Sequence, residues 1–245
     1  MQKKALLKIL QSPGSWVAQR GPSRPLPQLP ISWGFFIIVT SALMIVGQVL
    51  INILPYPGSR LVVSAIIELL ILRGALYWRG MNFKAIGLSL EQGSTELKIG
   101  LGISLAWVAV FSLNNTLAGS PPALEWLIYL ARDPSVQRLR DTLIWLLRTA
   151  ADALAVGIVE EVIHRGWILT FLIMSLRSYE RALWLSALVF GVPHYYLGLK
   201  GIIVTAAFGY ICGLLYLWRK NLVVPIILHT LWDFALWIGV LGKLG

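Results

Sequence analysis

Long apolar runs, separated by short polar or turn-forming segments, make up most of the chain. A bilayer core accommodates about 20 apolar residues in each helix that crosses it. The runs predict spans at about 33–54, 61–78, 98–118, 181–195, 201–218 and 222–241. The stretch 141–176 is too long for one straight span, so a break is expected near 153–157. The total is seven spans, or eight if 138–152 inserts on its own.

The composition supports the same fold class. Hydrophobic residues form 57% of the chain and charged residues only 13%, which is too apolar for a water-soluble domain of this length. We therefore predict an all-α fold, a polytopic transmembrane helical bundle of about seven or eight spans.

Three parts follow from the pattern along the chain. Residues 1–30 form a basic, Pro-rich tail, with an amphipathic segment at its start and prolines from Pro13 onward that are expected to break any helix. Residues 31–140 form an N-terminal transmembrane region, which ends in an interfacial segment at 123–140. Residues 141–245 form a second transmembrane domain.

The net charge of +10 has an ordinary explanation in a membrane protein, because Lys and Arg gather in cytoplasmic loops. With seven spans and a cytoplasmic amino terminus, twelve Lys and Arg residues lie inside and six outside. We therefore predict an integral, multi-pass membrane protein with a cytoplasmic N-terminus. The expected partners are the lipid bilayer and a peptide or membrane-protein substrate, and nucleic acid is not expected.

Ionisable residues are concentrated within the apolar helices of the second domain. Each costs about 2.5–3.5 kcal/mol to insert, so it usually has a partner or a task. Residues four apart share a helix face, which allows two pairs within single helices. The residues concerned are Glu160, Glu161, His164, Arg165, His194, His229 and Asp233, and the two pairs are Glu161–Arg165 and His229–Asp233.

Glu160 lies about 100° around its helix from Glu161, so it is free to face another helix. Three helices can then bring the Glu160 carboxylate and the imidazoles of His194 and His229 to one buried point. These groups suit water activation, which needs a general base and a donor for a developing oxyanion.

Three motifs occur in order on these helices. They are Glu-Glu-x-x-x-Arg at 160–165, Phe-x-x-x-His at 190–194 and His-x-x-x-Asp at 229–233. In this order the chain resembles the CPBP (Abi) family of intramembrane proteases, which includes the type II CAAX prenyl endopeptidases. The resemblance covers roughly residues 150–241, and we treat 141–245 as a CPBP-like catalytic domain.

The resemblance implies peptide-bond hydrolysis in the membrane by a glutamate-activated water. By position, Glu160 is the general base, His194 helps to hold the water, and His229 and Asp233 stabilise the oxyanion. Glu161 and Arg165 form a supporting pair. His164 departs from the family pattern, which more often has an aromatic or apolar residue there, and it is expected to be a packed histidine.

Several alternatives stay open. No cofactor is expected, because the zinc-protease signature His-Glu-x-x-His is absent; if zinc is used, its ligands are Glu160, His194 and His229.

A non-catalytic binding or regulatory protein of the same fold is the alternative function. A proton-relaying transporter is disfavoured, because no repeated half with broken helices is present. Prenylated CAAX proteins, leader peptides and membrane-protein tails are all open as substrates.

Asp233 allows two roles. It either donates a hydrogen bond to the oxyanion in its protonated form, or stays ionised and orients His229, one turn away on the same face.

Overall fold

The computed structural model describes residues 13–20, 29–54, 60–117, 125–132 and 135–240. These residues are almost entirely helical and contain no strand, so the predicted all-α bundle is confirmed. The elements are α2 (Pro13–Arg20), α3 (Trp33–Ile53), α4 (Arg60–Trp78), η1 (Phe83–Ile86), α5 (Gly93–Leu117), α6 (Glu125–Arg132), α7 (Val136–Glu161), η2 (Val162–Leu169), α8 (Thr170–Leu176), α9 (Tyr179–Gly191), η3 (Val192–Leu197), α10 (Gly198–Arg219) and α11 (Val223–Trp237).

Within the described residues, five continuous helical stretches are long and apolar enough to cross a membrane. Helices α3, α4 and α5 are three of them. The stretch Tyr179–Arg219 consists of α9 and α10, which η3 joins into a hairpin. A Cβ atom on Gly191 would lie 2.7 Å from the Cβ of Ala206, so the two helices touch just after the turn. Helix α11 is a shorter apolar helix.

The stretch Val136–Leu176 is one continuous helix of 41 residues. The predicted break near 153–157 is therefore wrong. Gly157 does not interrupt the helix; it lets α7 approach Thr230 of α11. At 1.5 Å per residue the helix is about 60 Å long, roughly twice the thickness of the hydrocarbon core.

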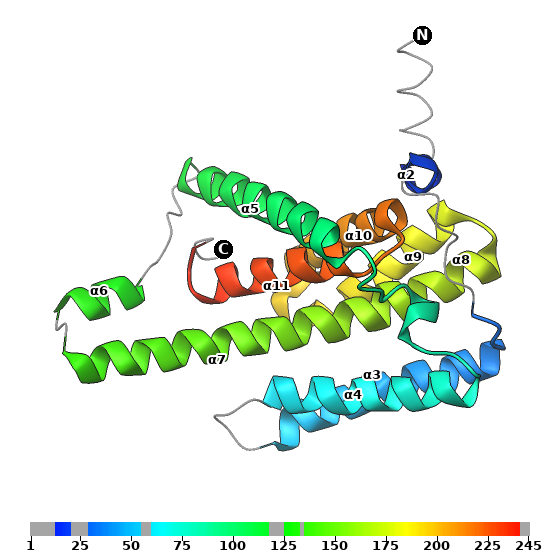
Figure 1. Cartoon of the computed structure of the whole chain (residues 1–245), viewed down its shortest axis with the longest axis horizontal. Coiled ribbons are helices and arrows are strands. Elements are labelled where there is room, and N and C mark those ends of the chain that lie inside the picture. The colour runs from blue at the N-terminus through cyan, green and yellow to red at the C-terminus, as the bar shows by residue number, and fades with distance from the viewer. Residues whose placement is uncertain (1–12, 21–28, 55–59, 118–124, 133–134, 241–245) are drawn as a thin grey trace, which may run out of the picture.

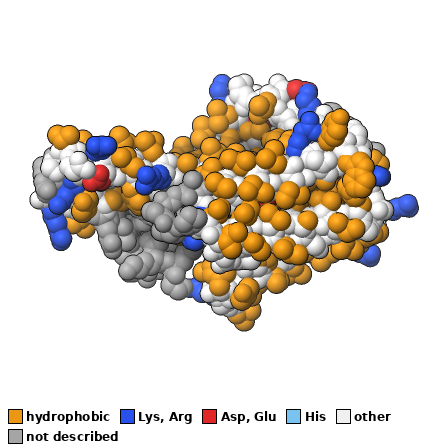
Figure 2. All heavy atoms as spheres, turned by 90° about the horizontal axis from the view of Figure 1, so that it is seen from below, with side chains coloured by type: hydrophobic (Ala, Val, Ile, Leu, Met, Phe, Trp, Pro, Cys, Tyr) orange, Lys and Arg blue, Asp and Glu red, His pale blue; other side chains and the backbone are white. Residues whose placement is uncertain are grey.

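The N-terminal part of α7 projects from the bundle together with α6 (Figure 1). The guanidinium of Arg138 lies 4.3 Å from the ring centroid of Tyr129, which joins the two helices. Figure 2 shows Lys and Arg side chains on this projection, whereas the neighbouring face of the bundle is almost wholly hydrophobic.

The remaining helices pack around α7 and α11. Helix α11 lies between α5 and α7, and α4 packs against another side of α7 (Figure 1). Helix α3 packs against α4, and α9 and α10 pack against each other. The C-terminal half of α7 and the length of α11 are therefore enclosed by the bundle.

Loops from both halves of the chain meet at one end of the bundle. The guanidinium of Arg219 donates two hydrogen bonds, of 2.9 and 3.0 Å, to the buried carboxylate of Glu96. The side-chain amide of Asn221 donates to the carbonyl oxygen of Ser89 at 2.8 Å. An eighth span would put these two loops on opposite membrane faces, so the seven-span arrangement agrees with the structure.

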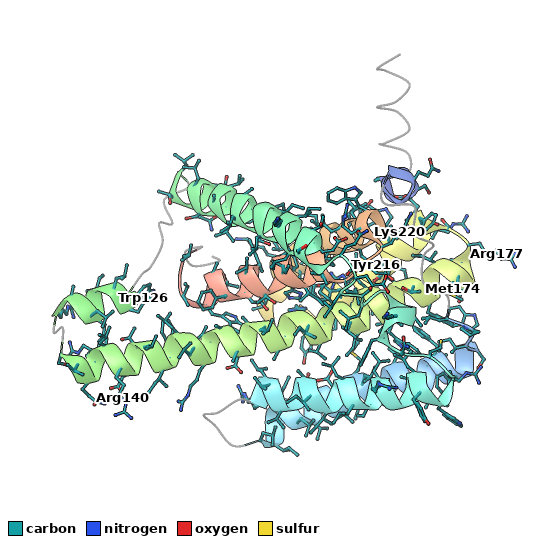
Figure 3. All side chains as sticks on the ribbon, in the orientation of Figure 1. Trp126, Arg140, Met174, Arg177, Tyr216 and Lys220 are labelled. Atoms are coloured by element: carbon teal, nitrogen blue, oxygen red, sulfur yellow. The ribbon has the colours of Figure 1, made fainter. Side chains whose placement is uncertain are left out.

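This end of the bundle is basic. Figure 3 places Arg177 and Lys220 at this end. Both residues end a helix in the left-handed conformation, each with φ of 50°.

Helix α2 gives part of the tail a place in the fold. It begins at Pro13 and packs against α9 and α10, and the Gly14 amide donates to the Glu180 carboxylate at 2.9 Å. Proline fits the first turn of a helix, where its missing N–H has no partner to lose. Whether Pro13 also ends a helix before it concerns residues outside the described ones. The amphipathic segment expected at the start of the tail lies outside the described residues.

The positive-inside rule predicts that the basic end faces the cytoplasm. A cysteine in place of Ser94 should react with a membrane-impermeant thiol reagent only after permeabilisation. A cysteine in place of Arg140, which is exposed on the projecting part of α7 (Figure 3), should react in intact cells. The parent protein is the control, because Cys212 is buried. Labelling of the Ser94 variant in intact cells would reverse the assigned orientation.

Candidate active site

Glu161 is the innermost group of the site, with no exposed surface. Its Oε1 atom lies 2.8 Å from the Nη1 atom of Arg165 on the same helix. The same oxygen accepts a hydrogen bond of 2.7 Å from Nδ1 of His229 on α11. The pair of Glu161 and Arg165 was expected from their spacing, whereas the bond to His229 was not.

Arg165 connects this carboxylate to two further helices. Its Nη2 atom donates to the carbonyl oxygen of Gly209 on α10 at 3.0 Å. Its guanidinium lies 4.3 Å from the ring centroid of Phe190 on α9, a distance that suits a cation–π interaction. One buried salt bridge thus fixes the positions of α7, α9, α10 and α11.

His229 lies between the fully buried Glu161 and the two more exposed carboxylates of the site, Glu160 and Asp233. Its Nε2 atom lies 3.7 Å from Oε2 of Glu160 and 3.6 Å from Oδ2 of Asp233. Neither carboxylate is within hydrogen-bond distance of Nε2, although both lie close enough for one water beside them to contact the imidazole and a carboxylate together. The side chain of His229 is only 4% exposed, against 30% for Glu160 and 14% for Asp233.

His194 comes from η3, the short 3₁₀ segment between α9 and α10. Its Nδ1 atom lies 3.1 Å from the carbonyl oxygen of Phe190. A carbonyl can only accept, so Nδ1 carries the proton and Nε2 is left for another partner. His194 is half-buried and lies within electrostatic range of His229 and Asp233.

Phe190 is the apolar centre around which the histidines are arranged. Its ring centroid lies 4.9 Å from that of His164, 5.5 Å from that of His194 and 5.8 Å from that of His229. Phe190 therefore packs beside the site. Gly209 permits this position, because a Cβ there would lie 2.8 Å from the Phe190 ring.

His164 is buried against Phe190, in an edge-to-face arrangement. Its Nδ1 atom has no hydrogen-bond partner among the described residues. This agrees with the expected packed histidine, although it leaves one buried nitrogen unsatisfied.

Residues Val162–Leu169 form a π-helix, which follows Glu161 directly. Wider turns of this type frequently occur at functional sites. The hydroxyl of Thr170 donates to the carbonyl oxygen of Arg165, five residues earlier, at 3.2 Å. The amino-acid composition of this segment does not indicate a change of helix type, so the sequence did not predict the π-helix.

Glu68 on α4 is a carboxylate that sequence reasoning left unassigned. It accepts a hydrogen bond of 2.8 Å from the Ser64 hydroxyl, and it lies within electrostatic range of Glu160. Its place within a predicted span was the signal that could have identified it, because buried carboxylates in membranes usually have a task.

The described residues contain no group of three or more His, Cys, Asp and Glu side chains placed to hold a metal ion. The alternative zinc ligands Glu160, His194 and His229 do not form such a group. Nδ1 of His229 is engaged by Glu161 and Nδ1 of His194 by the Phe190 carbonyl, which leaves the Nε2 atom of each ring for another partner.

The fold and the site together define a polytopic membrane protein with a carboxylate–imidazole centre inside its helical bundle. Residues 142–235 match the family model described as type II CAAX prenyl endopeptidase Rce1-like. The match extends from α7 into α11 and contains all three motifs, so the family resemblance is confirmed for this segment. The segment is therefore similar to the type II CAAX prenyl endopeptidases. No curated protein and no solved structure matches the chain.

The contact between α7 and α11 places Glu160 and Glu161 beside His229, and Gly157 makes this contact close. A Cβ there would meet the hydroxyl of Thr230 and lie 2.9 Å from its backbone nitrogen. Gly157→Ala should therefore separate the helices, with a loss of about 1–3 kcal/mol of stability. Thermal unfolding in detergent measures this loss.

Gly102→Ala on α5 is the matched control, because a Cβ there has no atom within 4 Å. It should gain stability from the better helix propensity of alanine. Equal stability of the two variants would show that the α7–α11 contact does not depend on Gly157.

Proposed function

We propose that the chain is an intramembrane endopeptidase in which Glu160 activates the attacking water. The observation that carries this proposal is the position of His229. Its Nδ1 atom is held by Glu161, and its Nε2 atom lies between the carboxylates of Glu160 and Asp233 at 3.7 and 3.6 Å. This arrangement supplies a partly exposed base next to an imidazole whose orientation is fixed.

Glu160 suits the role of general base because it is the more exposed of the two adjacent glutamates. Oε1 of Glu161 is already engaged by Arg165 and His229, and the whole side chain is fully buried, so bulk water does not reach this carboxylate. Glu160 has no such hydrogen bond to His229, and its partial exposure allows a water to reach it. His194 supports this role, since its free Nε2 atom can accept a hydrogen bond from the same water.

The proposed reaction begins when the Glu160 carboxylate takes a proton from water. The hydroxide oxygen bonds to the carbonyl carbon of the scissile peptide, and the carbonyl electrons move to its oxygen, which becomes an oxyanion. Glu160 then passes the proton to the amide nitrogen and the C–N bond breaks. The carbonyl re-forms, and the products are a carboxylic acid and an amine.

The oxyanion needs hydrogen-bond donors that are in place before it forms. In its charged form, His229 donates Nδ1–H to Glu161 and presents Nε2–H to the oxyanion. Glu161 therefore has the orienting role that the sequence analysis offered to Asp233. Asp233 is then free to act as a second donor in its protonated form.

The apolar surroundings favour a substrate that is itself membrane-embedded or lipid-modified. Prenylated CAAX proteins, leader peptides and membrane-protein tails all satisfy this requirement. Cleavage of a membrane peptide library by the purified protein in detergent distinguishes them. Binding without cleavage would favour the alternative of a non-catalytic binding protein.

Replacement of the proposed base gives the most direct test. Glu160→Gln keeps the shape of the side chain but removes the basic carboxylate, so turnover should fall by about 10²–10⁴-fold. Glu91→Gln is the matched control, since Glu91 is exposed in a loop and pairs only with Lys84 among the described residues. Strong chelators should leave the wild-type rate unchanged. A folded Glu160→Gln protein with normal turnover would exclude Glu160 as the base.

Asp233→Asn separates the two roles of Asp233. Asparagine still donates a hydrogen bond but carries no charge, so direct donation predicts near-normal turnover. Orientation of a charged His229 by Asp233 predicts a large loss. We expect near-normal turnover, because Glu161 already holds the Nδ1 atom of His229 at 2.7 Å. Turnover as low as that of Asp233→Ala would contradict direct donation.

A further inference from the structure

The segment η3 brings more than His194 to the site. It consists of two short helical turns joined by a kink at His194, whose backbone departs from helical geometry (φ −86°, ψ 20°), and Gly198 follows it with φ of 72°. Two adjacent tyrosines, Tyr195 and Tyr196, come directly after His194. Both are exposed on the surface, at 73% and 71%.

Tyr196 is the tyrosine that faces the site. Its ring centroid lies 5.9 Å from that of His194, with an angle of 32° between the ring planes. Its hydroxyl group is within electrostatic range of both Glu160 and Asp233. Among the described residues, this hydroxyl has no hydrogen-bond partner.

We propose that Tyr196 is a further catalytic residue, whose hydroxyl donates a hydrogen bond to the scissile carbonyl oxygen as it becomes an oxyanion. This inference rests on the proposed endopeptidase function. Tyrosine hydroxyls are among the side-chain donors that stabilise such oxyanions. The donor lies at the end of a rigid ring that packs beside His194, and it interacts electrostatically with Glu160 and Asp233, which places it on the same side of the molecule as the site.

The exposure of Tyr196 fits this role. A hydroxyl that is already paired within the protein would have to break a bond before it could meet the substrate. A free hydroxyl on the open side of the site can instead be covered by the bound peptide, which removes water around it and strengthens its hydrogen bond. Tyr196 lies in the matched segment but in none of the three motifs, so the motif residues alone do not reveal it.

Tyr195 provides a matched control within the same segment. Successive residues of a 3₁₀ helix are about 120° apart around its axis, so Tyr195 and Tyr196 point in different directions. Their ring centroids are 6.4 Å apart at an angle of 78°. Removing either hydroxyl keeps this ring contact, and both positions are exposed, so neither change should affect folding.

The experiment compares Tyr196→Phe, Tyr195→Phe, Glu160→Gln and the wild type in detergent. Turnover of a cleaved membrane peptide is one readout. The other is the affinity for a phosphinate peptide, whose tetrahedral group mimics the oxyanion intermediate, relative to the affinity for the unmodified peptide. Loss of one oxyanion donor typically lowers kcat by about 10²–10³-fold. Tyr196→Phe should show a loss approaching this range, with weaker phosphinate binding and unchanged binding of the unmodified peptide.

Tyr195→Phe should match the wild type in both readouts. Tyr196→Phe with wild-type turnover and wild-type phosphinate affinity would overturn the proposal for Tyr196 and leave the endopeptidase function intact. Equal losses in the two tyrosine variants would also overturn it. A wild-type protein that neither cleaves the peptides nor prefers the phosphinate would exclude both the endopeptidase function and this role of Tyr196.

Discussion

The carboxylate of Glu161 is the group on which the rest of the site depends. It is fully buried, and one of its oxygens contacts both Arg165 and His229. An ionised group without a partner in a membrane interior is costly, and removal of one partner from a buried pair leaves an uncompensated charge. The contact therefore selects one arrangement of α7 against α11. Through Arg165 the same contact reaches α9 and α10, so four helices share one electrostatic constraint.

Close packing of the helices lets Glu161 contact Arg165 and His229 at distances below 3 Å. Between helices in a bilayer, association relies on van der Waals contact and hydrogen bonds, and small residues let backbones approach. Gly157 does this for α7 and α11, and Gly209 does it for Phe190 against α10. A larger residue at either position would lengthen the bonds of Arg165 or His229. The hydrogen bonds and ion pairs of the site thus depend on the close apolar packing of the helices that carry them.

The sequence predicted the elements of this site well, because its signals are local. The apolar runs located the helices within a few residues, and the four-residue spacing predicted that Glu161 and Arg165 meet. The bond from Glu161 to His229 could not be predicted in this way, since it joins residues 68 positions apart. The continuous helix through Gly157 was missed for a related reason. A glycine within an apolar run indicates a helix break when the sequence is considered alone. The close contact with Thr230 explains why Gly157 occurs within a continuous helix.

The place of Tyr196 was also hidden from the sequence. Two adjacent tyrosines after a histidine look equivalent in a pattern of apolar and polar positions. The backbone of η3 distinguishes them, because a 3₁₀ turn directs successive side chains about 120° apart. The geometry of a six-residue connection therefore decides which hydroxyl faces the carboxylates.

The first half of the chain contributes to the site by supporting α11. The family match begins at residue 142, so α3, α4 and α5 lie outside it. Helix α5 nevertheless packs along α11, where Gly100 admits the side chain of Ile227, and Phe111 meets the ring of Trp232 with centroids 4.8 Å apart. Ile227 and Trp232 are close neighbours of His229 and Asp233 in the sequence. At the basic end, Glu96 of α5 binds Arg219 just before α11 begins.

These contacts hold one side of α11 while α7 holds the other. A helix held on both sides cannot rotate, so Nδ1 of His229 stays directed at Glu161 and Nε2 at the two more exposed carboxylates. The first half of the chain therefore helps to fix the orientation of His229, although every motif residue belongs to the second half.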